Sequence, residues 1–424
     1  MNNDVQAGAA LIARRAHAAA VLLATCAMAH AAEPGEAIAN AFGRDSEVTL
    51  HLRSYYFDRL NPGDVQNAAW AIGGWAGYKT GWIADALQLG AVGYTSQRLW
   101  GPEDKGGTLL LATPQQPYSV LGEAFASLKL WEQTLTGGRF IVNQPEINPH
   151  DNRMTPVTYE GGSLGGAIGG LSYFGAYLGG TKQKTSERFV NFVEAANIAG
   201  TASEPLWLLS LSTEPVKGLG LRLSSYYVAN VLSSTMADVQ WLTTLDEDYR
   251  LRLSALAMYQ SSVGDDLLKG APFSTYSNGL RADLLTRAAT LSLAYQQTGR
   301  GSNYNTPYAG WAGYPSMIVK DFDVAGMKAW LLSASYDFAS LRLPGFAIQA
   351  AIAHGSDAIN ASSGAAQPNW IEYDLTADYR FSAKTWPEWV RPFWLRGRAG
   401  HVDMGASGVI DDYRIILNYE WVFK

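Results

Sequence analysis

The final stretch of the chain, residues 413–423, alternates between two kinds of side chain. The apolar or aromatic set is Tyr413, Ile415, Leu417, Tyr419, Trp421 and Phe423. The intervening set includes Arg414, Asn418 and Glu420, with Ile416 and Val422 as exceptions. Because successive side chains of a β-strand point to opposite faces, this segment predicts a strand with one apolar face and one face that accepts charge.

Residues 371–381 repeat this pattern, with Glu372, Asp374 and Asp378 on the polar face. Strands of soluble sandwiches also alternate, but they are usually shorter and expose their polar face. Segments of about ten residues with aromatic ends and charge on one face only are typical of a barrel in lipid. The two segments therefore predict an all-β fold, a transmembrane antiparallel β-barrel.

The composition agrees with a membrane barrel. Only 17% of the 424 residues are charged, whereas about a quarter is usual in soluble proteins. The 22 Tyr and 14 Trp are plentiful enough for the aromatic girdles of such a barrel. Length alone permits either about two or three soluble domains or one large barrel.

After residue 31, no segment offers about 18 uninterrupted apolar residues, so we expect no transmembrane helix. Residues 165–180 come closest, but their glycines and the Gly169–Gly170 pair predict two strands and a turn. Because lipid cannot satisfy free backbone N–H and C=O groups, a spanning chain without helices must close into a barrel.

Residues 1–31 have the pattern of a secretory signal peptide. Arg14 and Arg15 precede an apolar stretch over 16–28, and Ala29-His30-Ala31 fits a cleavage site. The chain's one cysteine, Cys26, lies in this segment, so we expect no disulfide in the exported protein. Lipidation of Cys26 is the alternative, although Thr25 before it fits poorly. We expect residues 32–46 to be a flexible N-terminal lead-in and residues 47–424 to form the barrel.

Strand-like segments recur along the whole of residues 47–424, and we expect about 18 of them, an even number as in bacterial single-chain barrels. They cover residues 48–57, 68–78, 87–95, 120–131, 134–139, 158–168, 171–180, 206–213, 219–228, 237–245, 249–261, 276–284, 288–298, 328–338, 346–354, 370–381, 392–402 and 413–423. Short connections such as 246–248 are expected at the periplasmic end. Long polar ones such as 140–157, 181–205 and 299–325 are expected to face outward or to fold into the lumen.

Basic side chains recur on the polar side of the predicted strands. The set is Arg53, Lys129, Arg139, Arg222, Arg250, Arg252, Arg281, Arg396, Arg398 and Arg414. A guanidinium faces hydrocarbon only at high cost, so we expect these groups to point into a water-filled lumen. There they would concentrate anions and bind carboxylates through paired hydrogen bonds. The alternative is that they only form salt bridges with acids of the same phase, such as Asp283 and Glu420.

The connection between two of the predicted strands, residues 139–161, contains turn-forming pairs and three stiffening prolines. Its composition fits either a loop outside the barrel or a loop that constricts the lumen. Its string Asn148-Pro149-His150-Asp151-Asn152-Arg153-Met154-Thr155-Pro156, followed by Thr158-Tyr159-Glu160-Gly161, resembles the third-loop signature of the OprD-type substrate-specific outer-membrane porins. Similar matches to that family, in the same order, are residues 50–59 (first strand), 189–196 (a loop) and 412–414 (final hairpin).

The resemblance implies a barrel of about 18 strands whose third loop folds inward and narrows the pore, facing a ladder of basic residues. Carried over by position, Asn148, Asp151 and Arg153 belong to that constricting loop, and we include Glu146 of the same loop. Solutes of this family are typically small and bear a carboxylate, such as amino acids or aromatic acids. Family members usually end on an aromatic residue read by the barrel assembly machinery, an expected partner, whereas Lys424 follows Phe423 here.

Other kinds of site have little support. The histidines after residue 31 show no metal-ligand spacing, no phosphate-binding loop is present, and the net charge of −6 disfavours nucleic acid, so no cofactor is expected. His354-Gly355-Ser356-Asp357 suggests a hydrolase only weakly, because it falls at a predicted strand end.

We therefore expect a passive, substrate-selective diffusion channel in the bacterial outer membrane, not an enzyme, for small anionic or zwitterionic solutes. One alternative is an outer-membrane barrel enzyme, a lipase or a protease, and another is a structural barrel with a plugged lumen. The sequence leaves open whether the channel is a monomer or a homotrimer.

Overall fold

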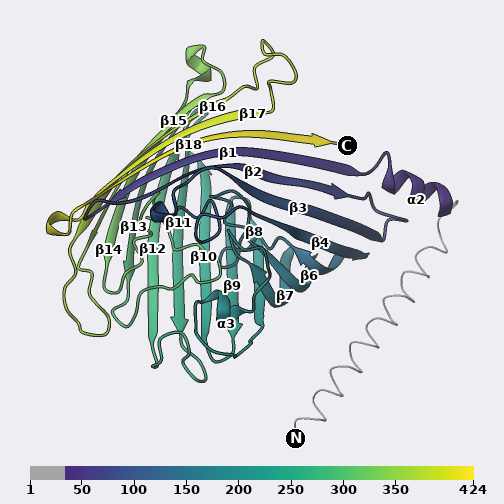
Figure 1. Ribbon diagram of the computed structural model, residues 1–424. Helices are drawn as coiled ribbons and strands as arrows, with labels where there is room; N and C mark the ends of the chain where they lie inside the picture. Colours follow the sequence, from purple (N-terminus) through teal and green to yellow (C-terminus); the bar gives the residue numbers. More distant parts are fainter. Residues whose placement is uncertain (1–33) are drawn as a thin grey trace, which may run out of the picture.

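The computed structural model describes residues 34–424 (Figure 1). The signal peptide predicted over residues 1–31 lies outside these residues. A single sheet of 18 antiparallel strands dominates the fold. The strands are β1 (Glu47–Asn61), β2 (Val65–Lys79), β3 (Leu87–Trp100), β4 (Tyr118–Leu130), β5 (Gln133–Phe140), β6 (Thr158–Ile168), β7 (Leu171–Lys182), β8 (Leu206–Val216), β9 (Leu219–Val228), β10 (Leu232–Thr244), β11 (Arg250–Ser261), β12 (Ser274–Leu285), β13 (Ala289–Thr298), β14 (Lys328–Asp337), β15 (Phe346–Ser356), β16 (Trp370–Arg380), β17 (Phe393–Asp403) and β18 (Val409–Phe423).

The sheet closes on itself because the first strand pairs with the last. Strand β1 is paired with β2 on one side and with β18 on the other, where Arg53 lies opposite Asn418. Every strand therefore has two neighbours, and no row of backbone N–H and C=O groups is left at an open edge. The predicted antiparallel barrel is confirmed, and each predicted strand overlaps an observed one.

The two faces of the strands differ as the alternation predicts. On β18, Tyr413, Ile415 and Trp421 are exposed, whereas Arg414 and Asn418 are buried. A soluble protein would show the reverse, with its apolar side chains covered. The exposed apolar band is the surface that meets lipid. We call the opposite face, which lines the interior of the barrel, the lumenal face.

The connections at the two ends of the barrel differ in length. The start of β1 and the end of β18 lie at one end (Figure 1), where several turns are tight; Gly169 and Gly170, for example, join β6 to β7 with φ of 57° and 85°. Such positive φ values cost glycine nothing. The long connections 101–117, 141–157, 183–205 and 299–327 are at the other end. The buried hydrophobic side chains of the strands pack against these long connections on the lumenal face.

The described part of the predicted lead-in, residues 34–46, contains a helix. Helix α2 (Pro34–Phe42) precedes β1 and is tied to the wall, because Tyr78 Oη donates to the carbonyl of Phe42 at 2.7 Å. At the other terminus, Lys424 Nζ lies 3.4 Å from Glu47 Oε2. A second helix, α3 (Phe192–Ala195), lies in the 183–205 connection. Within residues 34–424, no helix is both long enough and apolar enough to cross a membrane.

Candidate functional site

Guanidinium groups form a run across four neighbouring strands on the lumenal face. We call it the arginine run, and its members are Arg59 (β1), Arg414 (β18), Arg398 and Arg396 (β17), and Arg380 (β16). Arg59 pairs in register with Asp412, Arg414 lies directly opposite Arg398, and Arg396 lies opposite Asp378. Antiparallel partners point to the same face, so the register brings these charges side by side.

The arginine run extends the predicted set by Arg59 and Arg380. Both residues share the strand phase of predicted neighbours, Arg59 that of Arg53 and Arg380 that of Asp378. Both could therefore have been predicted from the alternation of side chains, because residues two apart in a strand lie on the same face. Arg380 lies over the Trp394 ring, with its Cζ 4.2 Å from the ring centroid, which holds the guanidinium against the wall.

Members of the run differ in how far acids neutralise them. The buried Asp412 accepts from Arg59 Nε at 2.8 Å and from Arg414 Nε at 2.5 Å. Asp378 accepts two hydrogen bonds from Arg396, at 2.7 and 2.9 Å. Among the described residues, Arg398 has a single polar contact, 3.3 Å from its Nε to Thr376 Oγ1, and the Arg380 side chain has none besides its contact with the Trp394 ring. Arg398 and Arg380 are therefore the members of the run with most donors left for a solute.

Three guanidinium groups surround one aromatic ring of β1, at the end of the run formed by β1 and β18. The guanidinium carbons of Arg59, Arg153 and Arg414 lie 5.3, 5.3 and 5.0 Å from the centroid of the Phe57 ring. The negative face of the ring stabilises cations, and so partly offsets the repulsion between them. This cluster joins the wall to the 141–157 loop, which contributes Arg153.

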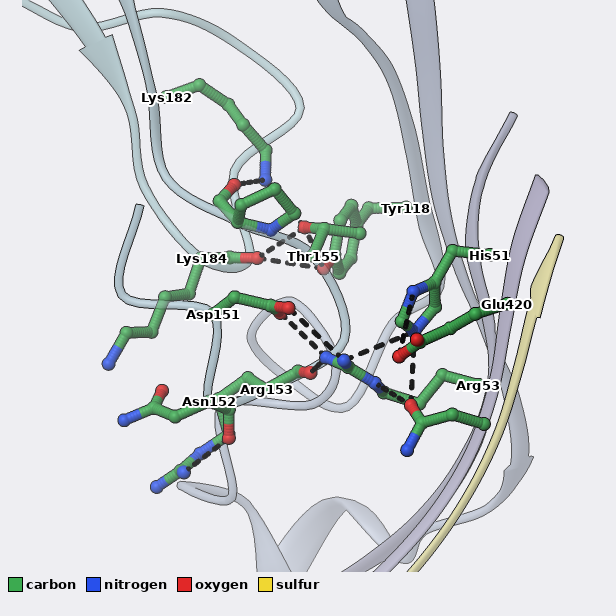
Figure 2. Close-up of polar contacts among 12 residues, drawn as sticks. His51, Arg53, Tyr118, Asp151, Asn152, Arg153, Thr155, Lys182, Lys184 and Glu420 are labelled. Atoms are coloured by element: carbon green, nitrogen blue, oxygen red, sulfur yellow. Dashed lines mark hydrogen bonds and ion pairs between the residues drawn. The ribbon is translucent and has the colours of Figure 1, made fainter. Parts of the chain in front are cut away.

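Arg53 binds that loop directly (Figure 2). Its Nη1 and Nη2 donate to the two carboxylate oxygens of Asp151 at 2.7 and 3.2 Å, and its Nε donates to Asn418 at 2.7 Å. Arg53 also donates to the carbonyl of Arg153. A bidentate guanidinium–carboxylate pair fixes geometry as well as charge, so one wall arginine holds the loop in place.

The predicted loop residues have different environments. Asp151 faces Arg53 and remains partly exposed, whereas Arg153 is buried and donates from Nε to the carbonyl of Thr108 at 3.0 Å. Burial and nearby arginines lower the pKa of Arg153 to about 10, so it stays charged at neutral pH. Asn148 stabilises the loop's own turn by accepting the backbone N–H of His150 at 2.9 Å.

Glu146, included in the predicted constricting loop, does not present a charged carboxylate to the lumen. It is 4% exposed, and both carboxylate oxygens are buried without a hydrogen-bond partner. The 299–327 loop covers it, since Trp311 N donates to the carbonyl of Pro145 at 2.9 Å. Burial raises the pKa of Glu146 to about 8, so this carboxyl is protonated at neutral pH.

A second group of basic side chains lies on β4, β9, β11 and β12, also on the lumenal face. Arg252 and Arg281 both donate to the buried Asp283 at 2.8 Å. Arg222 is 3.8 Å from Asp238, and Arg250 is exposed beside the turn that precedes β11. Lys129 Nζ lies 5.9 Å from the centroid of the Trp82 ring.

Arg139 lies on the outer face, so its predicted lumenal position is wrong. Its neighbour Phe140 belongs to the buried cluster, and the next side chain along a strand must point the other way. Arg139 Nε donates to Glu160 at 2.8 Å, and both side chains are partly exposed. This ion pair at the end of β5 lets a guanidinium remain on the outer face.

The 299–327 loop is held by two acids that the sequence analysis did not assign to it. Glu372 accepts the backbone N–H groups of Val319 and Lys320 at 2.7 and 2.9 Å, and Asp374 accepts that of Ile318 at 2.8 Å. Arg414 donates to the carbonyl of Ile318 at 2.8 Å. The sequence signal for this role was that Glu372 and Asp374 both lie on the lumenal side of the predicted strand, with no basic residue close to them in the sequence.

Under this loop, the two basic groups meet at a cavity of 160 Å³. Arg281 and Arg398 line it together with Asp374, Tyr314 and Ser316. One carboxylate oxygen of Asp374 is buried there without a partner. Two guanidinium groups with hydroxyl groups between them are suited to bind a carboxylate. Within the described part of the chain, no group of three His, Cys, Asp or Glu side chains is placed to hold a metal ion.

Comparison with known proteins agrees with this architecture. Residues 40–423 match the family model described as outer membrane porin, OprD family. Porin D of Pseudomonas aeruginosa is 23% identical over 93% of this chain and 94% of its own length.

Solved structures show the same fold. The crystal structure of P. aeruginosa OccK9 (OpdG) superposes with a TM-score of 0.79 at 22% identity, over 90% of this chain and all of that one. P. aeruginosa OpdK, solved with vanillate, gives a TM-score of 0.80 at 18% identity with the same coverage.

Proposed function

Because the chain belongs to the OprD family of outer-membrane porins, we propose that it is a passive channel selective for small solutes that bear a carboxylate. It is a porin of the bacterial outer membrane and not an enzyme. The observation that carries the solute class is the arginine run, which extends over four strands of the lumenal face.

In this proposal the arginine run binds an acid in successive steps. A carboxylate would exchange one guanidinium for the next, because adjacent members offer the same paired donors. Arg398 is the main contact, since Thr376 is its one polar partner among the described residues and it lines the cavity under the 299–327 loop. Fixed cations in a narrow aqueous path also raise the local concentration of anions.

The 141–157 loop is proposed to narrow this path. The support is its attachment to the wall through Arg53 and Asp151, and the position of Arg153 beside Phe57. A partly exposed Asp151 near so many cations would favour solutes with a positive group as well, such as amino acids. The vanillate in the OpdK structure supports aromatic acids as a second class.

Liposome swelling and planar-bilayer recordings test the solute class. Arg398→Gln should slow the entry of benzoate about tenfold, the effect of losing roughly 1.4 kcal/mol from one charged hydrogen-bonding group. A neutral sugar of similar size should enter as before. Arg139→Gln is the matched control, because it removes the same charge from the outer face.

Equal slowing of benzoate and sugar by Arg398→Gln would contradict the role of the arginine run. Purified protein that gives no conductance steps in a bilayer would contradict the channel itself and favour the plugged barrel.

A further inference from the structure

A separate cavity of 240 Å³ lies among the long connections, at the end of the barrel opposite the end of β18. The 141–157, 183–205 and 299–327 loops all contribute to its walls. Its polar lining residues include His150, Lys184, Thr185 and Thr306, and no acidic residue lines it. It is distinct from the cavity between Arg281 and Arg398, with which it shares no lining residue.

Lys184 is held by its backbone, which leaves its amine free (Figure 2). Its carbonyl accepts from Tyr118 Oη at 2.8 Å and from Thr155 Oγ1 at 3.1 Å. The side chain extends from this anchor in the direction away from Arg53 and His51. Within residues 34–424, its Nζ has no hydrogen-bond partner and no carboxylate within ion-pair distance.

His150 supplies a second nitrogen-bearing group to the same cavity. Its backbone N–H donates to Asn148 Oδ1 at 2.9 Å, which fixes the residue in the loop turn. Its imidazole makes no hydrogen bond with the described residues. An ammonium group, an imidazole and the nearby threonine hydroxyls together offer donors for the two oxygens of a carboxylate.

The rest of the lining is apolar. Val157, Pro307, Tyr308 and Ala309 form this part, and Val157 and Tyr308 are almost fully buried. The cavity is smaller than the roughly 300–1,000 Å³ of pockets for drug-sized ligands. It therefore suits a small molecule with one anionic end and a compact hydrophobic body.

We infer that this cavity is an outer capture site that binds the carboxylate of a small hydrophobic acid at Lys184 and His150 before the acid reaches the arginine run. The inference rests on the proposed function for its solute class. It adds a separate site and an earlier binding step.

The charges around Lys184 give this site a pH dependence. Burial, Arg153 of the 141–157 loop and Arg414 of β18 lower the pKa of Lys184 to about 8, while Asp321 of the 299–327 loop opposes the shift. Burial, Lys184 and Arg153 lower the pKa of His150 to about 4. At pH 7 the amine is charged and the imidazole is neutral, so capture should weaken as the pH rises above about 8.

Binding of benzoate to the detergent-solubilised protein, measured by titration calorimetry, tests the inference directly. Lys184→Met should raise the Kd about tenfold at pH 7, and raising the pH from 7 to 9 should weaken wild-type binding, because benzoate stays ionised throughout. Lys269→Met is the matched control, since Lys269 is exposed in the 262–273 loop at the same end and lies outside the cavity. Unchanged benzoate affinity in a Lys184→Met protein that forms normal chloride-conducting pores would overturn the inference.

Lys184→Arg distinguishes a lost charge from a damaged loop. It should keep benzoate affinity at pH 7 and retain it at pH 9, since arginine does not titrate in this range. Measurements of benzoate flux distinguish the capture site from the arginine run. Lys184→Met should lower benzoate entry at low concentration and leave the saturated rate unchanged, whereas Arg398→Gln should lower the saturated rate. If Arg398→Gln leaves benzoate entry unchanged while Lys184→Met still weakens binding, the arginine run fails and the capture site stands.

Discussion

At the residue scale, burial decides what each ionisable group of the loops can do. Asp151 and Glu146 are both acids of the 141–157 loop, but Asp151 is paired with Arg53 and partly exposed. Glu146 is covered by the 299–327 loop and has no cation beside it. An unpaired carboxyl in such a place takes up a proton rather than remain charged. One loop therefore holds one charged and one neutral acid.

Glu146 should make the docking of its loop depend on pH. The pKa is about 8 in the docked loop, against a reference of 4.5, so the docked state binds the extra proton between these values. Docking should then be strongest below about pH 4.5, weaken as the pH rises toward 8, and change no further above it. Bilayer recordings should show more current fluctuation at pH 8 than at pH 5. Glu146→Gln should remove this difference.

Glu160→Gln is the control for that experiment, because Glu160 is an exposed acid on the outer face near the same end of the barrel. It should leave the pH dependence of the fluctuations intact. A wild-type channel with identical noise at both pH values would contradict the role assigned to Glu146.

At the element scale, the 299–327 loop depends on hydrogen bonds from strand side chains to its backbone. Glu372 and Asp374 of β16 accept three consecutive N–H groups, from Ile318 to Lys320. A segment without regular secondary structure must find partners for its backbone groups, and these acids supply them. The strand thereby fixes where the loop lies.

Glu372→Gln should release this segment. A glutamine presents one acceptor and one NH₂ group where two backbone donors arrive, so at least one hydrogen bond is lost. Amide exchange at residues 316–322, followed by mass spectrometry, should accelerate about tenfold, equivalent to roughly 1.4 kcal/mol of lost protection. Asp378→Asn on the same strand should leave that exchange unchanged, because Asp378 pairs with Arg396 and not with the loop.

At the scale of the whole molecule, the barrel is stable in lipid because its polar groups are satisfied internally. All strand edges are paired, and the exposed band on the outer face is apolar. Charged side chains occur on that face near strand ends and in pairs, as with Arg139 and Glu160. The outer surface is therefore much less tolerant of new charge than the lumenal face.

Neighbouring residues of β16 test this asymmetry. Leu375 is half exposed on the outer face, whereas Thr376 is buried on the lumenal face. Leu375→Arg should destabilise the folded barrel by about 2–4 kcal/mol near the membrane midplane, as judged by urea titration in lipid vesicles. Thr376→Arg should still cost less: the new guanidinium faces Arg398, but Asp374 and Asp378 lie on the same face of β16 and the lumen holds water. Equal destabilisation by the two changes would contradict the assignment of the faces.

The order of the strands and the faces of most of them were predictable, because a period of two is a local property of the backbone. Arg414 and Asn418 could be assigned to the lumenal face from their immediate neighbours. Arg139 could not, because Gly137 and Gly138 before it provide no apolar alternation to set the phase. Its position depends on the pairing of β5 with β4 and β6.

The alternation of side chains along the strands was enough to predict a closed barrel with apolar side chains outside and most arginines inside. Which arginines are neutralised, the burial of Glu146, and the attachment of the 299–327 loop to Glu372 and Asp374 follow from packing between distant parts of the chain. Those contacts join residues that are far apart in the chain, for example Arg53 with Asp151 and Ile318 with Asp374. No local sequence pattern predicts such contacts, because the long connections have no regular secondary structure. Their positions depend on the part of the barrel wall against which they pack.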